Sequence, residues 1–102
     1  WVGTWGGGLE LIQRDGNKIT FVHHRNDPYQ ASSLSADIVW PILEDASGVL
    51  WAGTINGGLN KVNPQTQRFG LFRSHPDDPQ SLSFDVIGGF YEDGAGDVWV
   101  GT

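Results

Sequence analysis

The chain has 102 residues, with six Lys and Arg against twelve Asp and Glu, and a formal net charge of −6. Its few basic residues are scattered, so it lacks the basic surface that nucleic acid or an anionic membrane binds. It contains no cysteine, which excludes disulfides and cysteine-based zinc sites. It also has no apolar run of about 18 residues, the length that a membrane-spanning helix needs.

Nine short strands are expected, because apolar and polar residues alternate between turn residues. In chain order they lie near residues 1–4, 9–13, 18–24, 38–44, 49–54, 58–63, 67–73, 86–92 and 97–102. No stretch of ten or more residues has the 3.6-residue period of a capped helix. Asn56-Gly57 and the glycine run Gly6-Gly7-Gly8 accept positive φ, so both predict tight hairpin turns. The sequence therefore predicts an all-β fold.

One motif recurs along the chain. Trp1-Val-Gly-Thr4 returns as Trp51-Ala-Gly-Thr54 and begins again as Trp99-Val-Gly-Thr102, at intervals of 50 and 48 residues. A fixed period of this size indicates repeats of one supersecondary unit, and short strands with glycine turns indicate β-propeller blades. We predict a first repeat at residues 1–50, a second at 51–98 and the start of a third at 99–102. Each repeat is expected to form a four-stranded antiparallel sheet.

The recurring motif is expected to have a structural role. The period of two along a strand places each tryptophan and its glycine on one face, where the missing Cβ lets a neighbouring sheet approach closely. The structural repeat residues are Trp1, Gly3, Trp51, Gly53, Trp99 and Gly101.

The strand at 38–44 is expected to lie at an edge, because Pro41 cannot donate to a ladder. Gly88-Gly89 take the matching place in the strand at 86–92. We therefore expect these to be the innermost strands of two blades, reached through long crossing connections near 25–36 and 74–85. Both proline and glycine suit a crowded axis.

Two repeats do not close a propeller, which needs about four to eight blades. Other blades are therefore expected as partners, either from a longer chain or from copies of this one in an oligomer. The start at Trp1 and the absence of methionine favour a piece of a longer chain.

Metal, cofactor and catalytic sites are not predicted. His23 and His24 are neighbours on a strand, so their side chains point to opposite faces and do not chelate one ion. The turn from Asp93 to Asp97 lacks the alternating ligands of a calcium loop, which favours turn capping. The neighbouring carboxylates in Glu44-Asp45 and Glu92-Asp93 diverge in the same way as the histidines, which is poor geometry for acid–base catalysis.

Sugar recognition uses exposed aromatic faces beside hydrogen-bonding side chains, because the rings stack on the apolar face of a pyranose. The candidates are the aromatic residues outside the repeated motif and the polar residues near them in the crossing loops. These ligand-binding candidates are Trp5, Tyr29, Gln30, Trp40, Asp37, Gln80, Phe84, Asp85 and Tyr91. The alternative is that Trp40 and Tyr91 only fill the wall of the channel, and that Trp5 covers a neighbouring blade.

The segment from Glu44 to Leu59 resembles the two-component regulator propeller repeat, through Asp45-Ala-Ser-Gly48, Trp51-Ala-Gly-Thr54 and Gly57-Gly58. The likeness continues through residues 63–69 and 79–83 and covers nearly the whole chain in two copies. The resemblance implies seven-bladed propellers in the exported sensor region of two-component system proteins, often hybrid histidine kinases. In this chain, Trp5-Gly6 and Asp15-Gly16-Asn17 depart from the usual turns of the family.

The resemblance thus implies a non-catalytic segment of a periplasmic or extracellular sensor in signal transduction. Such a segment would recognise a ligand, with an oligosaccharide as the favoured class, or scaffold that recognition. Two alternatives stay open. One is a purely structural, self-assembling protein-interaction module. The other, ranked last, is a glycan-active or lyase enzyme on a propeller, for which Asp37 and Asp85 are the carboxylates to test.

Overall fold

The computed structural model describes residues 1–63 and 65–102. The strands are β1 (Val2–Gly3), β2 (Leu9–Asp15), β3 (Lys18–His24), β4 (Val39–Glu44), β5 (Leu50–Thr54), β6 (Leu59–Val62), β7 (Phe69–Phe72), β8 (Gly89–Glu92) and β9 (Val98–Gly101). Each lies at a predicted strand, and the described residues form no helix. The all-β class is confirmed. Across these residues there is accordingly no helix of the length and apolarity needed to cross a membrane.

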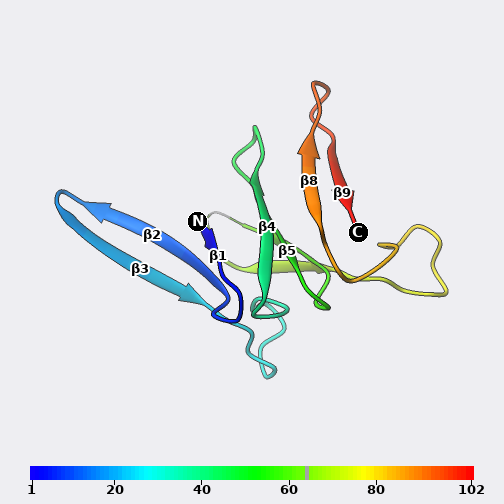
Figure 1. The fold of residues 1–102 in the computed structure, drawn as a ribbon, viewed down its shortest axis with the longest axis horizontal. Helices are drawn as coiled ribbons and strands as arrows, with labels where there is room; N and C mark the ends of the chain where they lie inside the picture. The colour runs from blue at the N-terminus through cyan, green and yellow to red at the C-terminus, as the bar shows by residue number, and fades with distance from the viewer. Residues whose placement is uncertain (64) are drawn as a thin grey trace.

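The strands form three antiparallel sheets, which Figure 1 shows side by side. The first has the order β1-β2-β3, the second β4-β5-β6-β7 and the third β8-β9. The second sheet is the expected four-stranded blade. The strands divide over three sheets rather than two, because β4 of the first sequence repeat pairs with β5 of the second. The boundaries of the repeats at 1–50, 51–98 and 99–102 therefore do not coincide with the boundaries of the sheets. These repeats describe the repeating unit of the sequence, and as domains they remain a prediction.

The strand β4 lies at an edge of the second sheet, as its proline predicts. Its pairing with β5 shifts register between Val39 and Ile42, so Trp40 and Pro41 form a bulge. β4 also contacts β1 of the first sheet and β8 of the third. This edge strand is thus the point where all three sheets meet, as expected for an inner strand.

The hydrophobic core lies where the first and second sheets meet. Its buried members are Leu9, Leu34, Val39, Leu50, Ala52, Val62 and Phe69, with Trp1 and Ile42 packed against them. Leu50 and Ala52 share one face of β5, and Trp51 therefore lies on the other face. The Trp51 ring is half-buried, with its centroid 6.3 Å from that of Phe72.

The glycines of the recurring motif lie where neighbouring sheets touch. A Cβ placed on Gly53 would lie 2.5 Å from Cγ2 of Ile87, which leads into the third sheet, and 2.7 Å from Cγ of Pro41. A Cβ on Gly3 would lie 2.9 Å from the carbonyl oxygen of Val39, which opens β4. By contrast, a Cβ on Gly89 would meet nothing within 4 Å, so the expectation of crowding at the inner strands is not met there.

Figure 1 separates two ends of the molecule. The tips of the β4–β5 and β8–β9 hairpins lie at the top of the view. The turn between β1 and β2, in blue, and the first crossing loop, in cyan, lie at the bottom. Trp5 in this turn and Tyr29 and Gln30 in this crossing loop, three of the ligand-binding candidates, belong to this loop-bearing end.

Candidate functional site

The two crossing loops are built in the same way. In the first loop, Ser33 Oγ accepts a hydrogen bond from the Asp27 amide at 3.0 Å and lies 2.8 Å from the Gln30 carbonyl oxygen. In the second loop, Ser81 Oγ lies 2.9 Å from the His75 amide and 2.8 Å from the Asp78 carbonyl oxygen. A serine hydroxyl thus closes each loop.

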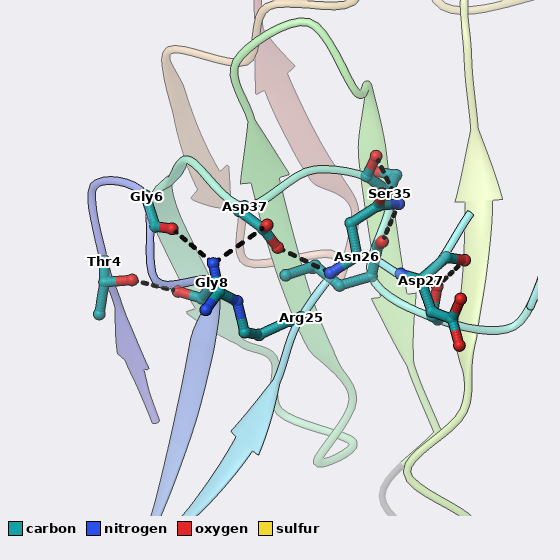
Figure 2. A network of polar contacts seen from close by, with 10 residues as sticks. Thr4, Gly6, Gly8, Arg25, Asn26, Asp27, Ser35 and Asp37 are labelled. Atoms are coloured by element: carbon teal, nitrogen blue, oxygen red, sulfur yellow. Dashed lines mark hydrogen bonds and ion pairs between the residues drawn. The ribbon is translucent and has the colours of Figure 1, made fainter. Parts of the chain in front are cut away.

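Asp37, a predicted ligand residue, is at the centre of the polar network in Figure 2. Its Oδ1 accepts from the Asn26 amide at 2.7 Å, and its Oδ2 lies 3.5 Å from Nη2 of Arg25. Its carbonyl oxygen accepts from the amides of Gly6 and Gly8, at 3.1 and 2.8 Å. Asp37 therefore ties the crossing loop both to the end of β3 and to the turn between β1 and β2.

Asp85 makes the corresponding contacts where the second sheet meets the third. Its Oδ1 accepts from the Ser74 amide at 2.7 Å, its Oδ2 lies 3.5 Å from Nη2 of Arg73, and its carbonyl accepts from the Gly58 amide at 3.0 Å. An arrangement that recurs with the repeat stabilises the fold. The spacing of 48 residues between Arg25 and Arg73, and between Asp37 and Asp85, is the sequence signal for it. Ligand binding by either carboxylate stays a prediction.

Asn60 also supports the first crossing loop, and the sequence reasoning missed it. Its side chain is fully buried in β6, accepts from the Ser35 amide at 3.2 Å and donates to Ser35 Oγ at 2.7 Å. Glu10 holds the matching position in the first repeat, so no recurring residue pointed to this contact.

The turns before the tryptophan strands are closed by aspartates. Asp45 accepts from the Trp51 indole Nε1 at 3.0 Å, from the Ser47 hydroxyl at 2.7 Å and from the Ser47 and Val49 amides at 3.0 and 3.1 Å. These hydrogen bonds, with that of Trp51 the largest cause, lower the pKa of Asp45 to about 2. The Trp99 indole likewise lowers the pKa of Asp93. Turn capping thus accounts for both carboxylates.

The two histidines diverge, as their place on one strand predicts. His23 Nδ1 lies 2.6 Å from a carboxylate oxygen of Glu10. The ring of His24 lies between the rings of Trp1 and Phe69, with centroids 5.6 and 5.3 Å away. Among the residues that the structure describes, no cluster of three side chains is suited to hold a metal ion.

Two of the aromatic candidates meet at the loop-bearing end. The side chains of Trp5 and Trp40 are 68% and 64% exposed, and their ring centroids lie 5.4 Å apart in an edge-to-face arrangement of 71°. Tyr29, Phe84 and Tyr91 are also exposed, and the register opposes Tyr91 to Trp99 on β9.

The remaining candidates lie apart from this pair. Gln30 lines a polar groove of about 330 Å³ that runs past β3 and residues 66–69, and the Gln80 amide donates to Asp78 in the second crossing loop at 2.9 Å. The structure therefore brings Trp5 and Trp40 together, with Asp37 three residues before Trp40 and bonded through its carbonyl to the amide of Gly6, and leaves the other candidates apart from them.

The structural repeat residues differ in exposure. Trp1 packs against the core and Trp51 is half-buried, whereas Trp99 is 64% exposed. Gly3 and Gly53 make the close approaches described above. A Cβ on Gly101 would meet only ordinary contacts, at 3.8 Å or more.

Comparison with known protein families supports the assignment of propeller blades. No curated protein matches the chain. The family model described as two-component regulator propeller matches residues 81–102, which hold the end of the second crossing loop, β8 and β9. The resemblance noted in the sequence is confirmed over these residues. Residues 81–102 therefore match a repeat of the two-component regulator propeller family, whose propellers are typical of two-component sensor proteins.

Proposed function

We propose that this chain is a non-catalytic part of an extracytoplasmic sensor, in which it recognises an oligosaccharide or scaffolds its recognition. The observation that carries the proposal is the match to the two-component regulator propeller at residues 81–102. Fold alone does not fix function, so the ligand has to be argued from a site. The crossing loops support recognition, because hydrogen bonds to Asp37 and Asp85 hold them in place and exposed aromatic rings lie in or beside them.

The proposed place of this recognition is the periplasm or the extracellular space. Sensor propellers of this family are typically periplasmic, and the absence of cysteine is compatible with export. Binding transmits a signal only if the ligand has different affinities for two states of the protein. The proposal therefore requires both binding and a change in the conformational equilibrium.

Calorimetry on the intact protein that carries this segment tests the proposal. Neutral and acidic oligosaccharides of several linkages are titrated, with the corresponding monosaccharides as controls. We expect one class of oligosaccharide to bind and to alter limited proteolysis of the protein. No heat from any oligosaccharide, with an unchanged proteolysis pattern, contradicts recognition and favours a purely structural role.

A second candidate function is assembly with further blades, from the same longer chain or from copies of it. The observation that favours it is the 64% exposure of the Trp99 ring, at a position where Trp1 packs against the core of the next sheet. Exposed sheet edges also pair readily with other strands. Light scattering tests self-assembly: a discrete oligomer of this segment supports it, and a stable monomer contradicts it.

A further inference from the structure

The first junction is the contact between the first and second sheets, and the second junction is the contact between the second and third sheets. Comparing the two shows which contacts recur with the fold and which occur once. At the first junction the Val39 amide donates to the Thr4 carbonyl at 2.9 Å, and at the second the Ile87 amide donates to the Thr54 carbonyl at 3.0 Å. Each junction also has the arginine–aspartate pair of its crossing loop, at 3.5 Å in both cases. These two contacts are therefore made in the same way at both junctions, and the first junction adds the Trp5–Ile38 bridge and a hydrogen bond from the Gly6 amide to the Asp37 carbonyl.

The side chains beside these shared contacts differ between the junctions. The first presents Trp5 and Trp40, whereas the second has Ile55 and Gly88 at the matching positions of the repeat. Since the second junction forms without indole rings, the fold does not require the tryptophan pair. Two exposed tryptophans that the fold does not require indicate a surface with another role.

Local backbone structure holds the two rings in place. Trp5 forms an isolated antiparallel bridge with Ile38, and Trp40 lies in the bulge of β4. Bulges often turn a side chain toward a functional surface. The pair is thus an aromatic platform, defined as Trp5 and Trp40, whose rings cross at 71° and stay more than 60% exposed.

The indole N–H groups of this platform differ from those of the recurring motif. The Trp51 and Trp99 indoles donate to Asp45 and Asp93. Neither platform indole donates to a protein acceptor within residues 1–63 and 65–102. Each platform ring therefore offers an apolar face together with a free donor, a combination that suits a ligand with apolar and hydroxyl surfaces.

The charges beside the platform favour a neutral ligand. Gly6, which follows Trp5, accepts from Arg25, and Asp37, which precedes the bridged Ile38, pairs with the same arginine. This pair is neutral as a whole, and the chain carries a formal charge of −6. An anionic ligand would meet no free positive charge in this place and would be repelled by the chain.

We propose that the aromatic platform is a stacking subsite for a neutral hexopyranose oligosaccharide. The proposal rests on the recognition function put forward above. The axial C–H groups of one sugar ring stack on an indole face, and the crossed second indole contacts the next sugar. Sugar hydroxyls accept from the free indole N–H groups. The second junction, with Ile55 and Gly88, offers no such surface and marks the first junction as the ligand side.

The test uses the intact protein with Trp5→Ala and Trp40→Ala, and with Ile55→Ala as the matched control at the second junction. The probes are cello-, malto- and laminari-hexaose, with hexagalacturonate as the anionic contrast. Affinity is measured by calorimetry, and the indole N–H resonances report which rings are touched. We expect each tryptophan variant to weaken binding of a neutral hexaose by about tenfold or more, and Ile55→Ala by less than about twofold.

Trp5→Phe and Trp40→Phe guard against loss of folding, because an aromatic ring at either place should retain much of the affinity. Unchanged affinity in both alanine variants overturns the subsite and leaves oligosaccharide recognition standing. Failure of all three neutral hexaoses to bind the unaltered protein overturns the subsite, and the wider titration described above then decides the recognition function. Preference for hexagalacturonate overturns the neutral ligand, and loss of self-association in Trp5→Ala without any change in sugar affinity assigns the platform to a contact between copies.

Discussion

Asp45 closes a turn and positions a large ring at once. One carboxylate oxygen accepts from the backbone of the turn, and the other accepts from the Trp51 indole at 3.0 Å. Because Trp51 is only half-buried, this hydrogen bond fixes a ring that packing alone does not enclose. The sequence predicted turn capping for the matching turn at Asp93, but the bond from Asp45 to Trp51 depends on how the hairpin folds back, which spacing does not reveal.

Stability should depend on the charge of Asp45. Its pKa falls from the ordinary 3.8 to about 2 in the folded protein, so the folded state binds its proton less readily than the unfolded state. The stabilisation is therefore present above about pH 4 and is lost as the pH falls toward about 2. Urea unfolding at several pH values should show a smaller loss of stability over this range in Asp45→Asn than in the unaltered protein. The exposed Asp77→Asn serves as control, and an equally steep loss in Asp45→Asn contradicts the prediction.

Gly53 should tolerate no side chain. A Cβ there would overlap Ile87 and Pro41, and the sheet junction leaves neither of them free to withdraw. We expect Gly53→Ala to lower the free energy of unfolding by about 1–3 kcal/mol, measured by denaturant unfolding. Gly89→Ala is the matched control, because its Cβ would meet open space, and it should change stability by less than about 0.5 kcal/mol. Equal costs for the two variants would show that close approach is not what keeps glycine at position 53.

At the scale of elements, the strands were predictable and their grouping was not. Alternation and turn residues mark each strand, and Pro41 marks β4 as an edge, because these are local properties. When each repeat is taken to begin at its tryptophan strand, β4 and β5 fall in different repeats. The sequence therefore does not show that they pair, since strand pairing depends on the folded structure. The register shift at Trp40 could not be predicted either, because residues 38–43 are apolar throughout and show no alternation whose phase could change.

Asn60 links β6 to the crossing loop, so its loss should loosen that loop. In Asn60→Ala the Ser35 amide loses its acceptor, and a lost buried hydrogen bond costs about 1–3 kcal/mol. We expect a drop of that size in the free energy of unfolding and faster hydrogen exchange at the Ser35 amide. Lys61→Ala, its exposed neighbour whose amine lies over the Trp51 ring, should cost at most about 1 kcal/mol and leave this amide protected. Unchanged exchange in Asn60→Ala would contradict the link.

At the scale of the whole molecule, comparing the two repeats separates contacts that recur, and so belong to the fold, from contacts that occur in one repeat alone. Each junction has an aspartate that links its crossing loop to the neighbouring strands, Asp37 at the first and Asp85 at the second, and we call these aspartates braces. The Trp5 and Trp40 pair occurs at the first junction alone among the described residues. The sequence predicted Asp37, Asp85, Trp5 and Trp40 as ligand residues. It could not distinguish them, because residue types near a loop do not show which side chains are already bonded within the protein. The distinction needed side-chain partners, which only the folded chain supplies.

Repeat proteins behave as chains of units that contact only their neighbours. Asp37 braces the first junction and Asp85 the second, and they share no partner. Each carboxylate accepts a backbone hydrogen bond at 2.7 Å and lies beside an arginine. We therefore expect Asp37→Ala and Asp85→Ala to lower the free energy of unfolding by about 1–2 kcal/mol each.

Their independence is the sharper expectation. In denaturant unfolding, the double variant should lose the sum of the two single effects to within about 0.5 kcal/mol, because distant sites without shared contacts are additive. The exposed Asp15→Ala, at the opposite end of the first sheet, controls for loss of a carboxylate. A coupling larger than about 1 kcal/mol would mean that β4–β7, the sheet between the two braces, transmits strain from one junction to the other. The blades would then respond to a ligand as one unit, and a change at the first junction would be felt at the third sheet.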